Sequence, residues 1–133
     1  MSASYHSGPV ITRAYTGSSD FRVGDRVKYH ATDGLALAVD EDVQDLGVVD
    51  RAHDATAGIG TGGNDVSIRL LSGAEIVWMR AAAAIAEGAT VFKAAAGEVD
   101  DGAGTRVVGT AMASAAGADE LVPVLPAHGA VWA

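Results

Sequence analysis

The sequence contains no cysteine, which excludes disulfide bonds and thiolate metal sites. It also lacks an apolar run of the ~18 residues that a membrane-spanning helix needs. The first residues, MSASYHSGP, have neither the basic region nor the apolar stretch of a signal peptide. These absences predict that the protein has no membrane partner and leave its redox compartment open.

Aromatic residues are also scarce, at 5% of the chain, although hydrophobic residues reach 49%. Most of the hydrophobic residues are Ala and Val, so the chain can bury a core of small side chains only. A length of 133 residues fits one domain, or two very small ones that share a core. Such a thin core favours association with further copies or with a partner, because marginal domains gain stability from binding.

Basic residues are outnumbered, nine to seventeen, which gives a formal net charge of -8. Twelve of the acids are Asp, and only two of the bases are Lys. This composition is typical of proteins from salt-adapted organisms, whose carboxylates stay hydrated in screening salt. A genome of high GC content would also favour Ala, Gly, Arg and Asp, and both explanations stay open. In either case the charge opposes binding to nucleic acid, which requires Lys/Arg patches.

The sequence carries no recognisable catalytic motif, and we expect no catalytic residue, no cofactor and no metal site. The four histidines lack the spacing of metal ligands, and no Gly-x-Ser-x-Gly motif occurs. The glycine-rich segment 58–63 leads into a strand and no Lys follows it, so it predicts a loop and not a phosphate site. The acid cluster at 40–42 with Asp45 does not match an EF-hand, and a solvated loop is favoured over a cation site.

Two parts of the chain are similar in sequence, and this similarity predicts an internal duplication. Residues 22–29 align with 86–93, and the same order is kept by three further pairs of segments: 10–13 with 76–79, 46–49 with 108–111, and 65–70 with 120–125. The alignment places Gly24 on Gly88 and Gly47 on Gly109. We therefore predict two repeats, about 10–71 and 76–125, with the same strand order, inside a duplicated domain at 10–126.

Within each repeat the apolar residues follow the period of a strand. Val66, Ile68 and Leu70 alternate with polar residues, and segments 22–29, 35–39 and 106–111 are short and β-branched or alternating. The alanine run from Met79 to Glu87 ends at Gly88 and predicts one short helix, although it has no clear N-cap. The predicted fold is mainly β, a small barrel or sandwich made of two similar halves with at most one short helix.

The order of these segments resembles the capsid cement or head decoration proteins of tailed viruses. In that family a strand of the type Gly-Asp-hydrophobic-Val is followed by a Gly-Val-Ala strand, a loop and a Val-x-Val strand. Here the corresponding segments are 24–27, 46–49 and 66–70, and the second repeat has them at 88–91, 108–111 and 122–124. The resemblance covers residues 10–126, with a long glycine loop and Pro123 as departures. Pro123 in the last strand predicts an edge or terminal strand.

The resemblance implies a structural virion protein on the outer face of an icosahedral capsid, and no enzyme. It implies the major capsid protein as partner, a homotrimer as the assembled form, and clamping of neighbouring capsid subunits. An alternative from the residues themselves is a surface β module that binds a receptor or a glycan, which an aromatic cluster on loops would favour.

The two ends of the chain, an N-terminal arm at 1–9 and a C-terminal tail at 127–133, belong to neither repeat. We expect them to contact a neighbouring cement subunit or the capsid protein, since Trp is enriched where proteins meet. The alternative is that Trp132 folds back on its own domain. The predicted contact residues are Tyr5, His6, Pro9, Val131 and Trp132.

Overall fold

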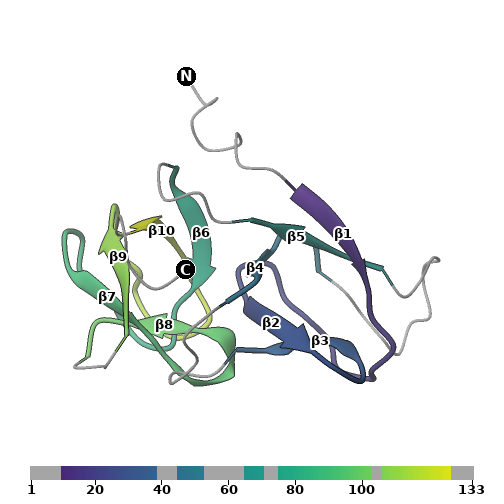
Figure 1. Cartoon of the computed structure of the whole chain (residues 1–133). Helices are drawn as coiled ribbons and strands as arrows, with labels where there is room; N and C mark the ends of the chain where they lie inside the picture. Colours follow the sequence, from purple (N-terminus) through teal and green to yellow (C-terminus); the bar gives the residue numbers. More distant parts are fainter. Residues whose placement is uncertain (1–9, 39–44, 53–64, 71–74, 103–105, 127–133) are drawn as a thin grey trace.

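The computed structural model describes residues 10–38, 45–52, 65–70, 75–102 and 106–126. They form two five-stranded antiparallel sheets that lie side by side (Figure 1). The first half contains β1 (Val10–Ala14), β2 (Arg26–His30), β3 (Gly34–Leu37), β4 (Gly47–Val49) and β5 (Asp65–Arg69). The second half contains β6 (Val77–Arg80), β7 (Thr90–Lys93), the 3-10 turn η2 (Ala95–Gly97), β8 (Val99–Asp100), β9 (Val107–Ala111) and β10 (Leu121–Pro126).

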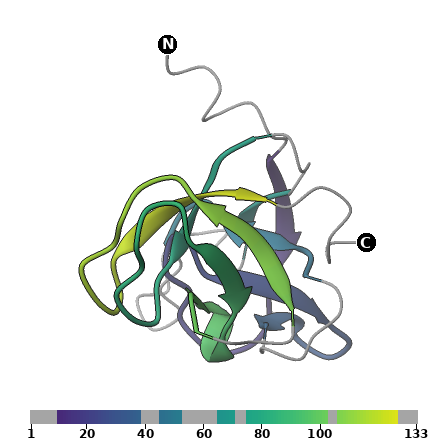
Figure 2. The same ribbon diagram turned by 90° about the vertical axis from the view of Figure 1, so that its left-hand side faces the viewer.

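The two halves have the same strand order. The first sheet runs β1-β5-β4-β2-β3, and the second runs β6-β10-β9-β7-β8, which is the same order shifted by five strands. Figure 2 looks from the side of the second half, whose strands curl in front of those of the first. The second sheet is closed further by a parallel bridge between Ala81 and Val99. The prediction of a mainly β fold made of two similar halves is confirmed.

The correspondence extends to strand register. Val27 pairs with Gly47 in the first half, and Val91 pairs with Gly109 at the same place in the second. Both glycines sit where a Cβ would collide with a backbone carbonyl oxygen of the next strand, that of Arg69 at Gly47 and that of Leu125 at Gly109. The two glycines occupy equivalent positions, as predicted, because the neighbouring strand comes too close at both places for any side chain to fit.

Register also corrects one part of the repeat alignment. Ile68 lies opposite Ile11, and Val124 lies opposite Val77, so Ile68 corresponds to Val124. The sequence alignment of this strand had placed Asp65 on Glu120, one residue too early. A shift of one residue exchanges the two faces of a strand. Only the observed register matches the buried Val66 with the buried Val122.

The predicted helix from Met79 to Glu87 does not form. Met79 lies in β6, and Ala81 and Ile85 make bridges to other segments and are buried. Helix propensity is a weak preference that tertiary contacts override, and this segment gains more from burying Met79, Ala81 and Ile85 than from local hydrogen bonds. The helical element that the described residues do contain is the short turn η2.

The position of Pro123 was also predicted wrongly, since β10 is an interior strand between β6 and β9. Pro123 is tolerated there for a local reason. Its carbonyl accepts a hydrogen bond from Met112 N, just after β9 ends at Ala111. Its ring nitrogen points to the same side, and the missing N–H falls where the pairing with β9 stops.

Each half has its own apolar core. The first core contains Phe21, whose ring meets that of Tyr15 edge to face with centroids 4.8 Å apart. Among the described residues, the second core has no aromatic side chain and consists of Val, Ala, Ile and Met side chains. Val48 of β4 belongs to this second core, so the two halves share one packed boundary.

Candidate functional site

The boundary between the halves is built around Arg26, which is fully buried. Its guanidinium crosses from β2 into the second half, where Nη2 donates to Ala94 O at 2.6 Å and Nε donates to Glu98 O at 3.1 Å. Nη1 donates to Asp45 Oδ2 at 2.9 Å. All three nitrogens therefore have acceptors, which is the condition for holding a charged group away from water.

Asp45 also contacts a cation of the second half. Its Oδ1 lies 3.3 Å from Lys93 Nζ, and both side chains are fully buried. The prediction of a solvated acidic loop is wrong at this residue, while 40–42 lie outside the described residues. Burial follows from the two cations on either side, because a carboxylate leaves water only when charges of opposite sign replace the water.

A second, more exposed ion cluster joins the halves at Arg22. Its guanidinium donates to Asp119 Oδ1 at 2.7 Å and to Glu98 Oε2 at 2.9 Å. The hydrogen bond to Asp119 is the main reason why the pKa of Arg22 is raised, and the same bond lowers the pKa of Asp119. These bonds tie the segment before β2 to β8 and β10. The halves are thus fixed to one another by both buried and exposed charges.

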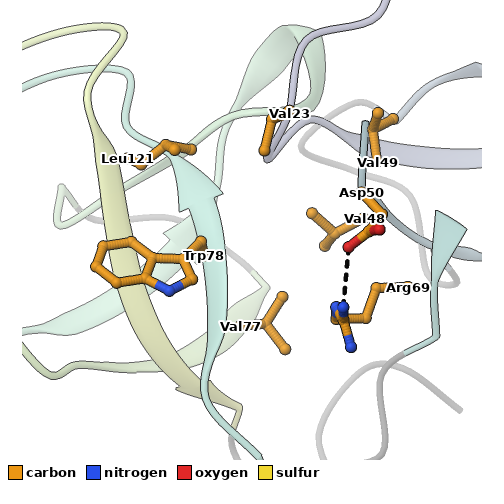
Figure 3. Close-up of a pocket in the computed structure, with 8 residues that line it drawn as sticks. All are labelled: Val23, Val48, Val49, Asp50, Arg69, Val77, Trp78 and Leu121. Atoms are coloured by element: carbon orange, nitrogen blue, oxygen red, sulfur yellow. Dashed lines mark hydrogen bonds and ion pairs between the residues drawn. The ribbon is translucent and has the colours of Figure 1, made fainter. Parts of the chain in front are cut away.

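A groove of about 360 Å³ lies between the halves beside β6 (Figure 3). Its walls are mostly apolar, and Asp50 and Arg69 pair with each other at 2.9 Å. Figure 3 shows the Trp78 indole turned toward β10 and away from Arg69. The residues that line the groove are Val23, Val48, Val49, Asp50, Arg69, Val77, Trp78 and Leu121.

The outer side of the second sheet continues this apolar surface. Trp78 lies opposite Pro123, and the Pro123 carbonyl accepts from Met112 N, so these three form one row across the strands. Trp78 is 44% exposed and Met112 is 43% exposed. We call this surface the apolar face; it comprises the exposed side chains of Trp78, Met112, Leu121 and Leu125 and the buried Pro123 between them.

The same positions of the first half are polar. The observed register and the backbone hydrogen bonds identify the equivalent positions of the two halves. For example, Asp50 N donates to Ser67 O in the first half, as Met112 N donates to Pro123 O in the second. The face of the first half, called the polar face, comprises Thr12, Asp50, Asp65, Ser67 and Arg69. An exposed apolar cluster is therefore a property of one half and not of the fold, and such clusters mark contact surfaces.

The predicted contact residues Tyr5, His6, Pro9, Val131 and Trp132 all lie outside the described residues, so their role stays a prediction. The glycine-rich segment 58–63 lies outside them as well. The structure thus brings forward a surface that the sequence reasoning missed. A comparison of the two repeats, position by position, would have shown it, because the alignment of 10–13 with 76–79 already puts Trp78 on Thr12.

Three observations bear on the other classes of site. The described ranges contain no group of three His, Asp or Glu side chains that could hold a metal ion. In the same ranges, no helix is long and apolar enough to cross a membrane. The large exposed aromatics there, Tyr29 and Trp78, lie on strands of different halves and not on one loop cluster.

Comparison with known proteins gives a likeness of fold. No family model and no curated protein matches the sequence. Among solved structures, the chain is similar to the crystal structure of the N base of head fibre gp8.5 in bacteriophage phi29, with a TM-score of 0.66. The match covers 90% of this chain and 95% of the other, at 14% sequence identity. The two proteins therefore share a fold.

Proposed function

We propose that this chain is a structural virion protein that binds the outer face of a tailed-virus capsid and clamps neighbouring capsid subunits. The observation that carries the proposal is the likeness to the base of a phage head fibre over nearly the whole of both chains. It agrees with the resemblance of the repeat segments to capsid cement proteins. A role in holding a shell together requires a rigid body with contact surfaces, and no catalytic group.

The boundary between the halves supports this role. A clamp that holds two capsid subunits must not open between its own contact points. Arg26 and Asp45 are buried at that boundary, and separating the halves would expose their bonds to Ala94, Glu98 and Lys93. Breaking a buried ion pair costs several kcal/mol. The two sheets consequently act as one unit.

Assembly as a homotrimer with the major capsid protein as partner belongs to the same proposal. Three weak contacts on one trimer act at high effective concentration, so each patch needs only modest affinity. The acidic charge of -8 agrees with a protein that faces outward and does not engage the packaged nucleic acid.

The test uses purified particles of the virus whose genome carries this sequence. We expect mass spectrometry to find the chain in the particles and electron cryomicroscopy to place it on the outer surface, across capsid subunits. Undecorated shells with added full chain should disassemble at a higher temperature than shells without it. Particles that lack the protein, together with shells that neither bind it nor gain stability, would overturn the proposal.

A further inference from the structure

Among the residues that the structure describes, the edge of β6 carries a backbone position without a hydrogen-bond partner. Within the same residues, β6 is an edge strand of the second sheet and is paired with β10 on one side only. Ala81 N donates to Glu120 O on the β10 side, whereas Arg80 N donates to Gly24 O on the opposite side. Backbone groups of alternate residues point to the same side of a strand. Trp78 therefore directs its N–H and C=O away from β10, as Arg80 does.

Those two groups of Trp78 face the groove between the halves. The segment Val23–Gly24 covers the edge only at Arg80, where Gly24 O accepts its bond. Among the described residues, no backbone hydrogen bond outside the sheet uses Trp78 N or O. An edge strand with free donors and acceptors is a template for another strand. Trp78, whose backbone groups would pair with such a strand, lines the same groove as the apolar residues Val48, Val49 and Leu121.

We propose that this edge binds one extended, uncharged and apolar strand of a partner protein, which adds to β6 at Trp78. The incoming backbone pairs with Trp78 N–H and C=O, and alternate side chains of the strand enter the groove or cover Leu121. This is the mode of recognition in which main-chain bonds give affinity and pockets give specificity. The proposal deepens the proposed function, on which it rests only for naming the partner as the shell protein.

Charge and shape select this occupant. The charges that line the groove, Asp50 and Arg69, are already paired with each other, so a charged partner segment gains nothing there. A second folded copy does not fit, because the opposite wall of the 360 Å³ groove belongs to the same molecule. A small apolar ligand would leave the backbone groups of Trp78 unpaired. A single extended segment satisfies both the walls and the backbone.

The first experiment uses isotope-labelled full chain and a short blocked peptide of alternating valine and threonine. We expect NMR shifts at Trp78, Val23 and Val48, and slower hydrogen exchange of the Trp78 amide. A copy of the peptide with methylated backbone nitrogens should bind at least about tenfold more weakly. The variant Trp78→Thr with Leu121→Asp, which installs the residues of the polar face, should lose at least about tenfold in affinity.

The matched control, Thr12→Ser with Asp65→Asn, alters the equivalent positions of the first half and should bind as the unchanged chain does. No shifts at β6, or equal binding of the methylated peptide, would overturn the proposal. If Trp78→Thr instead abolishes self-association in sedimentation while the peptide does not bind, the occupant is a second copy and the proposal is wrong. A fluorescent apolar dye that binds where the peptide fails would point to a small ligand, and the proposed strand would again be the wrong occupant.

A second experiment measures binding of the same variants to undecorated shells. We expect the Trp78→Thr, Leu121→Asp chain to bind at least about tenfold more weakly than the control variant. Undiminished binding of that chain would remove β6 from the shell contact and leave the proposed function intact. If the peptide binds at β6 but the unchanged chain does not bind shells, the proposed strand-binding site at β6 is supported. The proposed function as a capsid-binding protein is then overturned.

Discussion

The two halves of this protein share a backbone plan but differ in what they present to the outside. Gly24 N donates to Val49 O in the first half, and Gly88 N donates to Ala111 O in the second, at equivalent positions. Outside this shared frame, Thr12 stands where the other half has Trp78. Backbone bonds and buried volume constrain both copies equally, whereas an exposed side chain is free to change unless a partner constrains it.

The halves also differ in how they meet. Arg26 of β2 is fully buried at the boundary, and its equivalent in the second half, Thr90 of β7, is exposed. The first half thus supplies the charged residue that enters the second, and the second half supplies an apolar edge. The two halves therefore share a strand order but differ at the boundary and on their exposed faces.

The largest predicted effect breaks the boundary. Replacing Asp45 with Asn leaves Arg26 and Lys93 buried without their shared anion, and should reduce the free energy of unfolding by about 3–5 kcal/mol. Urea unfolding measures this loss. The control is Thr90→Ala at the position equivalent to Arg26, which should change stability by less than about 0.5 kcal/mol. A loss below about 1 kcal/mol for Asp45→Asn would contradict the role of the buried charges.

A smaller effect separates two glycines with the same backbone conformation. Gly24 has φ +92° and Gly88 has φ +86°. Alanine at either position costs about 1–2 kcal/mol for the left-handed backbone. A Cβ at Gly24 would also lie 2.5 Å from a Leu121 methyl and 3.0 Å from Arg80 N, whereas Gly88 has open space.

Gly24→Ala should therefore cost about 1 kcal/mol more than Gly88→Ala, since crowding against the second half adds to the conformational strain. Thermal unfolding of both variants in one buffer gives the comparison. Equal losses would mean that the segment before β2 does not pack tightly on β6.

The smallest effect concerns pH and the exposed cluster. The pKa of Asp119 is lowered mainly by its hydrogen bond from Arg22. A carboxyl with a lowered pKa in the folded state stabilises the fold above its unfolded pKa, and this contribution disappears as the pH falls through the folded value. Asp119→Asn should thus be slightly less stable than the unchanged chain at neutral pH and equal to it in acid.

Unfolding curves of the two proteins, measured from neutral pH down to about pH 2, follow this convergence, which spans the unfolded and folded pKa values of Asp119. Because Asp119 is exposed, high salt should reduce the difference. A difference that is constant across the whole pH range would rule out the ion pair as its source.

The strands and the two similar halves could be predicted from the sequence alone. Alternation of apolar residues fixes the buried side of a strand, as Val66 and Ile68 show, and the paired glycines mark sites where only a missing side chain is tolerated. These constraints act within a strand or between adjacent strands. They can be read locally, and they survive in both copies.

The burial of Asp45 and the exposure of Trp78 could not be predicted in this way, because each depends on residues distant in the chain. The sequence around Asp45 predicts a solvated acidic loop. In the fold, however, Arg26 of the first half and Lys93 of the second half both pair with Asp45 and allow it to be buried. The alanine run after β6 favours a helix in isolation, but Ala81 and Ile85 are buried in a core that forms only when the second sheet curls closed. Long-range contacts of this kind outweigh local propensity, since each buried group gains more from its neighbours than the backbone loses.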